Sequence, residues 1–327
     1  MLAAFAGACG GSDDEDSGTN GDDTLKVGLL TDQGQLNDRG FNELAYRGLQ
    51  EAERELGVEG RVVQAVSAAD YVPNMTSLVR QDFDLIIGVG FAHGDAVTRV
   101  AKRFPETKFA IIDVDQTTLE GKPENVVGLL FREEQVGYLA GYAAALAEKR
   151  RPGPDMISSV GGMKEPPVDR FIAGYQAGAR AAVPGVEILN AYSQDWEDIA
   201  KCKELALNQI ARGSGVVFQV AGGCGLGALE AAKEKSVWGI GVDADQFFLG
   251  QHILTSALKR VDEAVFATIE SVQDGTWEGG RNLTFGLAQD GVALGTFSPK
   301  VPQADKQAVQ TEAKKIARGD VNIPTSF

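Results

Sequence analysis

Residues 84–113, DLIIGVGFAHGDAVTRVAKRFPETKFAIID, give the clearest indication of how this chain folds. It contains two short apolar runs, LIIG and FAII, with the amphipathic segment DAVTRVAKRFP between them. Apolar runs without alternation predict strands that are buried on both faces, and an intervening helix predicts that such strands pair in parallel. We therefore expect one strand–helix–strand unit of a parallel sheet here.

The same alternation continues along the rest of the chain. A length of 327 residues exceeds what one compact core usually holds and suits two lobes. We therefore predict an α/β fold of two doubly wound parallel-sheet lobes joined by crossing strands. Further apolar runs that support this reading, each followed by a helix-like segment or a loop, lie at 27–30, 61–66, 125–131, 216–220 and 238–243.

The order of these units also predicts where the lobes divide. Residues 1–24 lie outside both lobes as a signal remnant and a flexible acidic linker. The N-terminal lobe takes residues 25–125 plus about 258–285, and the C-terminal lobe takes 126–257 plus about 286–327. Three connections between the lobes are expected near residues 114–133, 246–258 and 278–298.

Composition narrows the class of protein. The formal net charge of −15 argues against nucleic acid as a partner, because phosphate binding needs clustered Lys and Arg. The three cysteines and two histidines show no metal-ligand spacing, so we expect no metal site. A core of this size needs no covalent cross-link, which argues against a disulfide between Cys202 and Cys224.

The N-terminal sequence has the pattern of an export signal. The apolar run MLAAFAGA precedes Cys9, and the polar stretch GGSDDEDSGTNGDDT follows it. This order resembles the end of a bacterial lipoprotein signal, in which the cysteine receives the lipid and the polar stretch is a flexible tether. The other interpretation is a frayed terminus with an incidental cysteine. The lipoprotein interpretation predicts an extracytoplasmic protein that is anchored to the cell membrane by a lipid on Cys9.

Ligands of doubly wound sheets bind outside the carboxyl ends of the strands, so the residues at those ends are the candidate site. Carboxylates, aromatic rings and one lysine occur there. For each of them, a structural role as a helix cap or a core side chain is the competing interpretation. The candidates are Asp32, Phe41, Asp113, Phe218, Asp243 and Lys259.

Taken together, these side chains suit a particular ligand chemistry. Two aromatic rings from opposite lobes can sandwich a planar ring, at roughly 1–3 kcal/mol per stacked face. Carboxylates accept hydrogen bonds from ring N–H groups and from hydroxyls. The candidates include no cluster of Arg that could bind phosphate. The pattern therefore favours a neutral, planar, hydroxylated ligand, that is, a nucleoside rather than a nucleotide.

Several blocks of the sequence resemble the basic membrane protein family of bacterial lipoproteins, which includes purine nucleoside receptors of ABC importers. They are TDQGQLNDRGFN, IIGVGF, FAIIDVD, GLLFREEQVGYLAGYAAAL, VGGM with PVDRFIAGYQAGA, VVFQVAGGCG, GIGVDADQ and TSALKRVD, and they span about residues 26–275. The resemblance implies a type I periplasmic-binding-protein-like clamp without a cofactor. It also implies guanosine, inosine or adenosine as the ligand and an ABC permease as the partner. A clamp of this kind works as a monomer.

The resemblance also implies roles for individual residues. Phe41 and Phe218 would stack on the base, and Asp32 and Asp113 would hydrogen-bond it. Asp243 and Lys259 would bind the ribose, with Asn42 as a further contact. Gly40 departs from the family pattern, in which a small polar residue precedes the phenylalanine.

Three other functions compete with this one. The glycine-rich turns lack the spacing of a dinucleotide or P-loop motif, and no Asp cluster suits a nucleoside hydrolase, so we do not expect an enzyme. The same clamp could instead bind a sugar or a free base. It could also act as a sensor without a transporter.

Overall fold

The computed structural model describes Met1 and residues 24–327. Its first sheet has the strand order β11-β5-β4-β3-β1-β2, and all its strands are parallel. These strands are β1 (Lys26–Leu30), β2 (Glu59–Val63), β3 (Leu85–Gly88), β4 (Lys108–Ile112), β5 (Val126–Phe131) and β11 (Arg281–Phe285). The helices of this lobe are α1 (Phe41–Leu56), α2 (Tyr71–Val79), α3 (Gly94–Arg103) and α8 (Val261–Gln273).

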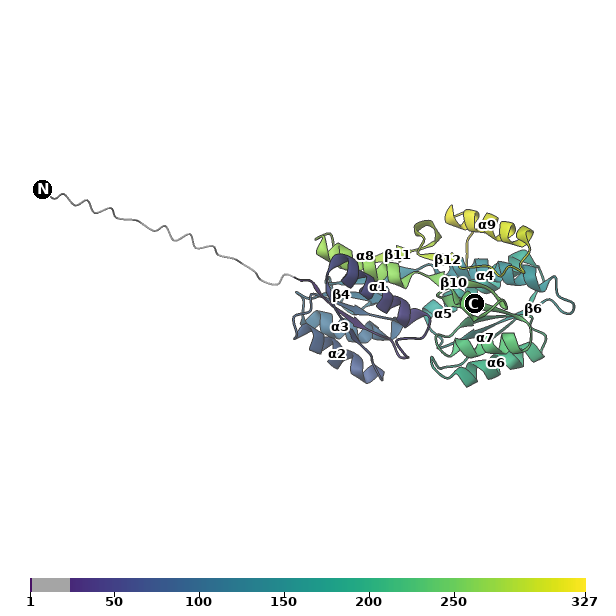
Figure 1. The fold of residues 1–327 in the computed structure, drawn as a ribbon, viewed down its shortest axis with the longest axis horizontal. Helices are drawn as coiled ribbons and strands as arrows, with labels where there is room; N and C mark the ends of the chain where they lie inside the picture. The colour runs from purple at the N-terminus through teal and green to yellow at the C-terminus, as the bar shows by residue number, and fades with distance from the viewer. Residues whose placement is uncertain (2–23) are drawn as a thin grey trace.

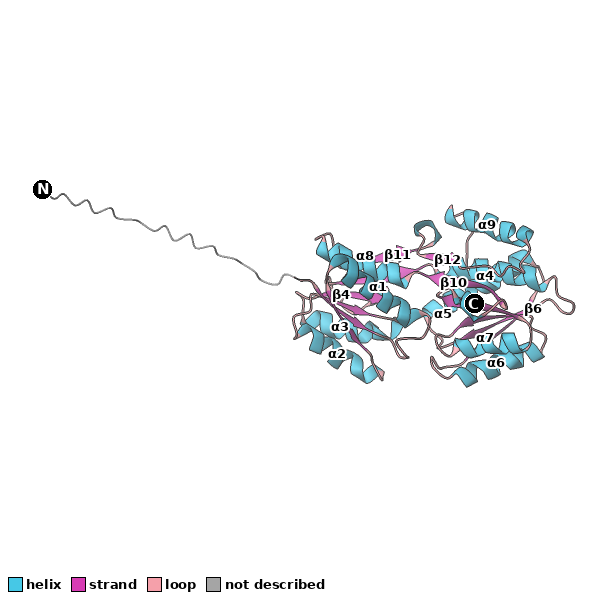
Figure 2. Cartoon of the chain, in the orientation of Figure 1, coloured by secondary structure: helices cyan, strands magenta, loops and turns pink. Residues whose placement is uncertain are grey.

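The second sheet has the order β12-β10-β9-β8-β6-β7, in which β12 alone among the described strands pairs antiparallel. Its strands are β6 (Met156–Gly161), β7 (Glu187–Tyr192), β8 (Val216–Val220), β9 (Trp238–Asp243), β10 (Ile253–Lys259) and β12 (Val292–Leu294). Its helices are α4 (Glu133–Glu148), α5 (Pro166–Ala182), α6 (Ile199–Ala211), α7 (Gly225–Glu234) and α9 (Gln303–Ala317). The predicted α/β fold with two parallel-dominated sheets is confirmed, and Figure 2 shows helices around each sheet.

The inner strands β1, β3, β4 and β5 of the first sheet are buried on both faces, which explains why they are continuous apolar runs. The edge strands β2 and β11 are more exposed and more polar. In β3, Leu85 and Ile87 belong to the core that faces α1 and α8, whereas Ile86 belongs to the core that faces α2 and α3. Figure 1 shows α8 beside α1, although the two helices are far apart in the sequence. The first lobe is therefore completed by a late part of the chain.

The register of the strands brings their carboxyl ends to one edge. Leu30 pairs with Gly88, and Gly88 pairs with Ile111. The loops that follow these strands therefore emerge together at the edge that faces the second lobe, where a cavity lies. This edge carries the candidate site.

The predicted lobe boundary after residue 125 is wrong by one strand. Residues 126–131 form β5, which pairs with β4 inside the first sheet. An apolar run at that point of the sequence fits equally well as the last strand of one sheet or the first of the next. The chain crosses between the sheets after β5, after β10 and after β11. The second crossing lies at 259–261 rather than within 246–258, because β10 belongs to the second sheet over its whole length.

The predicted lipid-accepting Cys9 lies outside the described residues. Among the helices of residues 24–327, none combines the length and the apolar character that a bilayer-spanning segment needs.

Candidate functional site

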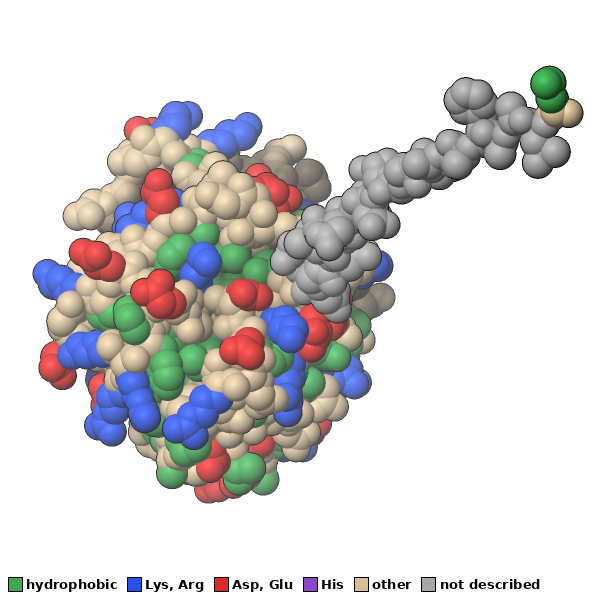
Figure 3. Space-filling model, turned by 90° about the vertical axis from the view of Figure 1, so that its left-hand side faces the viewer, with side chains coloured by type: hydrophobic (Ala, Val, Ile, Leu, Met, Phe, Trp, Pro, Cys, Tyr) green, Lys and Arg blue, Asp and Glu red, His purple; other side chains and the backbone are tan. Residues whose placement is uncertain are grey.

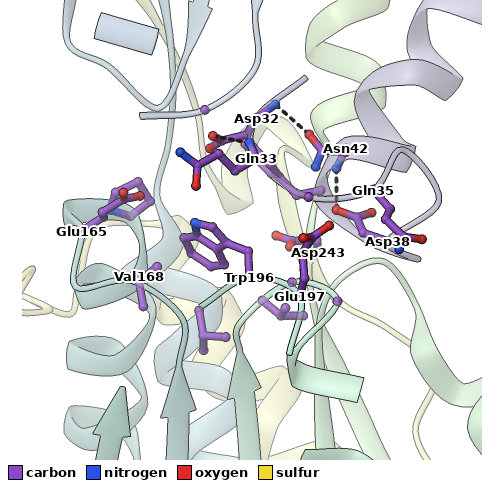
Figure 4. Close-up of a pocket in the computed structure, with 18 of the residues that line it drawn as sticks. Asp32, Gln33, Gln35, Asp38, Asn42, Glu165, Val168, Trp196, Glu197 and Asp243 are labelled. Carbon is purple, nitrogen blue, oxygen red and sulfur yellow. Dashed lines mark hydrogen bonds between the residues drawn. The ribbon is translucent and has the colours of Figure 1, made fainter. Parts of the chain in front are cut away.

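A cavity of about 170 Å³ lies between the two lobes. A single water needs only about 10–15 Å³ on this measure, so the cavity has room for a larger ligand. The first lobe contributes the loop after β1, the start of α1 and the ends of β3 and β4. The second lobe contributes the loops after β6, β7, β8 and β9, and the end of β10. Figure 4 shows side chains from both sides converging on this space.

Most of the candidates from the sequence meet here. Six of the seven predicted site residues line the cavity: Asp32, Phe41, Asn42, Asp113, Asp243 and Lys259. Strand-end placement brings them together from segments more than 200 residues apart. Their roles toward a ligand stay predictions.

The loop after β1 is fixed by a chain of hydrogen bonds that is drawn in part in Figure 4. The Asn42 side chain accepts from the Asp32 backbone N–H at 3.1 Å. The Asp38 carboxylate accepts from the backbone N–H groups of Gly40, Asn42 and Glu43, at 2.9, 2.9 and 3.2 Å. Asp38 therefore caps the N-terminus of α1, the role that the sequence allowed for Asp32. Asp32 is left to face the cavity.

The Asp32 carboxylate accepts hydrogen bonds from the Gln33 N–H at 2.7 Å and from the Tyr71 hydroxyl at 3.0 Å. Burial nevertheless raises the pKa of Asp32 to about 6, since these two bonds offset only part of the desolvation. Gly90 packs directly over this carboxylate: a Cβ there would lie 2.2 Å from Asp32 Oδ2, and φ is +104°. The GVG turn after β3 thus requires glycine at its last position.

Lys259 joins the two lobes through a buried ion network. Its Nζ donates to both carboxylate oxygens of Asp113, at 2.6 and 2.7 Å, and to Glu133 Oε1 at 2.9 Å. Arg170 binds the other oxygen of Glu133 at 2.6 Å. Lys259 Nζ also lies 5.1 Å from the centre of the Phe41 ring, within cation–π range. The network fixes one carboxylate of the first lobe against the end of β10.

The pKa values of Asp113, Glu133 and Lys259 result from two opposing effects, burial and the neighbouring charges. Burial raises the pKa of Asp113 to about 6, although Lys259 pulls it down. Burial also opposes ionisation of Glu133, but Lys259 and Arg170 together outweigh it and lower the pKa of Glu133. The pKa of Lys259 is raised, because the surrounding carboxylates outweigh the effect of burial. The network is therefore charged at neutral pH.

Asp243, at the end of β9 in the second lobe, is a carboxylate that lies outside this network. Within residues 24–327 no hydrogen-bond donor serves its carboxylate, and only 8% of the residue is exposed. Burial raises its pKa to about 7, although Lys259 lowers it. On the opposite wall, burial raises the pKa of Glu165 to about 7, with Asp32 and Asp113 adding to the shift. These two groups have unused hydrogen-bonding capacity that a ligand can reach.

Phe218 does not line the cavity, and its predicted contact with a ligand needs correction. Its side chain is fully buried in β8, with ring centres 5.0 Å from Tyr175 and 6.2 Å from Phe171 of α5. The cavity is reached two residues later, by Val220 at the end of the strand. Phe218 is a core residue in this structure.

Trp196 supplies the aromatic surface that the sequence reading assigned to Phe218. It lines the cavity from the loop after β7, and Figure 4 shows it between Glu165 and Asp243, facing Gln33. Its indole lies over Gly162, where a Cβ would come within 2.2 Å of the ring. Trp196 follows a strand end, as the other candidates do, so the same rule finds it once β7 is included.

A disulfide joins Cys202 of α6 to Cys224 at the start of α7. The expectation that these cysteines would stay unpaired is therefore wrong. The size of the core says whether a cross-link is needed for stability, but it does not say whether two cysteines lie side by side.

The side chains that line the cavity are suited to binding a ligand by hydrogen bonds and ring stacking. Carboxylates offer acceptors, and Phe41 and Trp196 offer flat apolar faces. Lys259 offers a positive charge, while its three N–H groups already serve Asp113 and Glu133. Within the described part of the chain, no group of three His, Cys, Asp or Glu side chains could hold a metal ion. The arrangement suits a ligand that is planar at one end and rich in N–H or O–H donors.

Comparison with known proteins agrees with this geometry. The model of the Bmp family, described as "ABC transporter substrate-binding protein PnrA-like", matches residues 25–326. The "ABC transporter nucleoside-binding protein BmpA" of Lactococcus lactis is 33% identical, with 99% of this chain and 96% of that protein covered. An uncharacterised lipoprotein of Pyrococcus horikoshii is 35% identical, with 89% and 74% covered.

Among solved structures, an ABC transporter solute-binding protein from Aeropyrum pernix has a TM-score of 0.82 and 29% identity. The superposition covers 92% of this chain and 93% of that one. The family match over nearly the whole folded chain, the relatives and the shared two-lobed architecture lead to one conclusion. The chain belongs to the Bmp family of PnrA-like ABC transporter substrate-binding proteins.

Proposed function

We propose that this protein binds a purine nucleoside between its lobes and delivers it to the permease of an ABC importer. The observation that carries the proposal is the pairing of flat aromatic faces with buried carboxylates in one interlobe cavity. Among the described residues that line the cavity, Lys259 is the sole Lys or Arg. A nucleoside matches this set, because it has a planar base, a hydroxylated sugar and no charge.

We assign each residue a role by its place in the cavity. Phe41 stacks on one face of the base, and Trp196 replaces Phe218 as the aromatic group on the opposite side. Asp32 and Asp113 accept hydrogen bonds from the base, and Asp243 and Lys259 bind the ribose. Asn42 holds the loop that carries Asp32. A phosphate group would meet several carboxylates here, which favours nucleosides over nucleotides.

Binding between lobes also provides the signal for transport. A ligand that contacts both lobes stabilises the closed form over the open one. The closed form then presents a matched pair of lobe surfaces to the permease, and the importer's ATPase supplies the energy. No catalytic step belongs to this proposal.

The same proposal places the protein outside the cytoplasm, attached by a lipid on Cys9. The relative in Pyrococcus horikoshii is described as a lipoprotein. The Cys202–Cys224 disulfide supports this location, because disulfides persist in oxidising compartments and are rare in the cytosol. Lys and Arg side chains are interspersed with Asp and Glu on the face in Figure 3, so that face offers no concentrated basic patch to nucleic acid.

The proposal is tested by native mass spectrometry of the purified protein and by a thermal-shift screen. The screen contains guanosine, inosine, adenosine, the free bases, the corresponding nucleotides and a set of sugars. We expect a co-purified purine nucleoside and a rise in melting temperature with nucleosides alone. A sugar or a free base that stabilises the protein more than any nucleoside would overturn the purine nucleoside assignment and leave the clamp.

A further inference from the structure

Two of the segments that the second lobe contributes to the cavity wall are far apart in its sequence. One is the loop after β7, which carries Trp196 and leads into α6. The other is the glycine turn Gly222–Gly223, which leads into α7. The disulfide between Cys202 and Cys224 joins the helices at the ends that follow these two segments. A single covalent bond therefore ties these two segments of the wall together.

The two half-cystines also hold the Trp196 loop through their backbone. The Cys224 N–H donates to the Trp196 carbonyl at 2.9 Å. The Cys202 N–H donates to the Asp198 carbonyl at 3.3 Å, and the Asp198 side chain caps α6 by accepting from the Lys201 N–H at 3.1 Å. Both ends of this short segment thus depend on where the cysteines lie.

Within the part of the chain that the structure describes, the Trp196 indole is fixed by apolar packing alone, because it packs against the edge of the main core. Its ring is half-buried and rests on Gly162, which offers a flat surface but no side chain to hold it in place. Among residues 24–327, no acceptor lies within hydrogen-bond distance of the Trp196 indole nitrogen. The orientation of the ring therefore depends on this apolar packing and on the backbone of its loop.

We propose that Cys202 and Cys224 are positioning residues of the ligand site. Their disulfide holds the Trp196 loop against the glycine turn, so that the indole is preorganised as the second aromatic wall. This inference rests on the proposed function for its ligand and on the structure for its geometry. Preorganisation of a binding loop raises affinity by reducing the entropy lost on binding.

The bond can be removed without loss of the surrounding core. Both cysteines are fully buried in an apolar cluster that also contains Ala206 and Ala228, on the helices α6 and α7. Replacement of each cysteine by alanine removes only the two sulfur atoms, so we expect most of this packing to remain. The expected effect is therefore local to the cavity wall.

A single-tryptophan protein makes the effect measurable. In a Trp238→Phe/Trp277→Phe background, Trp196 is the sole indole of the 327-residue chain, and Cys9→Ser removes the third thiol. The disulfide-intact protein is compared with the same protein carrying Cys202→Ala/Cys224→Ala. The readouts are the emission maximum of Trp196, its quenching by acrylamide, and the affinity for guanosine by titration calorimetry.

Without the bond, we expect a red-shifted emission, stronger quenching and an affinity about three- to tenfold lower. The matched control is Ala206→Gly, which loosens the same helix pair but keeps the disulfide and should leave the Trp196 signals unchanged. Unchanged emission, quenching and affinity in the alanine variant would overturn the proposal.

Two further outcomes are separable. If the alanine variant does not fold, the same readouts are taken on the parent protein reduced by TCEP, with thiol titration to report the opened bond. If the disulfide-intact protein binds no nucleoside, the proposed function fails. The emission and quenching data still decide whether the disulfide positions Trp196.

Discussion

The corner after β4 in the first lobe and the corner after β9 in the second have nearly the same sequence, DVDQ at 113–116 and DADQ at 243–246. In each, the first aspartate has a positive φ, 70° at Asp113 and 61° at Asp243, a conformation that aspartate tolerates better than most residues. The second aspartate caps a short 3-10 helix, and the glutamine is buried.

The two corners differ in what their first aspartate meets. Asp113 is held by Lys259 at 2.6 and 2.7 Å and has a pKa of about 6. Asp243 has no donor of this kind in the described residues, and its pKa is about 7. The same four residues therefore place an ion-paired carboxylate in one lobe and, in the other, a carboxylate without a hydrogen-bond donor among the described residues. The neighbours, rather than the motif, decide the role.

The largest effect is expected from Lys259→Met, which removes the cation that distinguishes the two corners. Asp113 and Glu133 would then be buried without their common partner. Loss of one partner from a buried ion pair costs about 3–5 kcal/mol of unfolding free energy, to be measured by urea denaturation at pH 7.5.

The control for this variant is Lys102→Met, which breaks an exposed pair with Glu120 and should cost less than about 1 kcal/mol. Equal losses in the two variants would show that Lys259 does not stabilise the junction between the lobes.

The two predicted phenylalanines extend the comparison of the lobes. Phe41→Ala should weaken guanosine binding about tenfold and leave the fold intact, because it removes a stacked face. Phe218→Ala should cost about 3–5 kcal/mol of stability, as core Phe→Ala changes do, with affinity changed less than about threefold. Calorimetric titration and urea unfolding of both variants separate these effects. A Phe218→Ala protein that folds normally but loses guanosine would return Phe218 to the site.

Asp243→Asn tests whether the Asp243 carboxylate is buried without a hydrogen-bond donor and therefore free to bind a ligand. Because its pKa is raised in the fold, its contribution to stability is full below about pH 4 and is lost as the pH rises through about 7. The neutral variant should therefore match the wild type near pH 4 and exceed it by roughly 2 kcal/mol at pH 8. Thermal unfolding from pH 4 to pH 8 measures the difference.

Guanosine binding should show the matching dependence, with wild-type affinity increasing as the pH rises through about 7, where Asp243 ionises. The Asp243→Asn protein should bind more weakly at pH 8 and lack this step. A step that persists in the variant would assign it to another group, with Glu165 the first to test.

The smallest effect is expected from Gly40→Ser, at the position that departs from the family. A Cβ there would lie 3.6 Å from Asp243 Oδ2, an ordinary contact distance. The serine hydroxyl could then donate to the carboxylate and lower its pKa. We expect the midpoint of the binding profile to move down by less than about one pH unit. An upward shift would contradict this donor role.

Much of the fold could be predicted, because apolar strands alternate with amphipathic helices and the rule for strand ends locates the cleft. Phe218 was misplaced for a physical reason. A strand buried on both faces has no polar alternation, so the sequence of β8 does not show which residue is the last to be covered. Trp196 follows β7, a half-buried edge strand whose sequence EILNAY lacks the continuous apolar run that marks the inner strands.

Contacts between segments that are far apart in the chain could not be predicted from the sequence. The pairing of Lys259 with Asp113 depends on how the lobes close, and the contact of Cys202 with Cys224 depends on how α6 packs against α7. Neither is encoded in a local pattern. The resemblance to a family supplied roles for residues, but it did not supply these contacts.

The interleaved course of the chain sets the order in which the molecule can fold. The first sheet lacks its edge strand β11, and α1 lacks its neighbour α8, until residues 261–285 leave the ribosome. Until then β5 presents an open edge to other chains. The second sheet likewise waits for β12. Neither sheet is complete before nearly the whole chain has been made. Both lobes therefore reach their final form late in folding, when β11 and β12 join them.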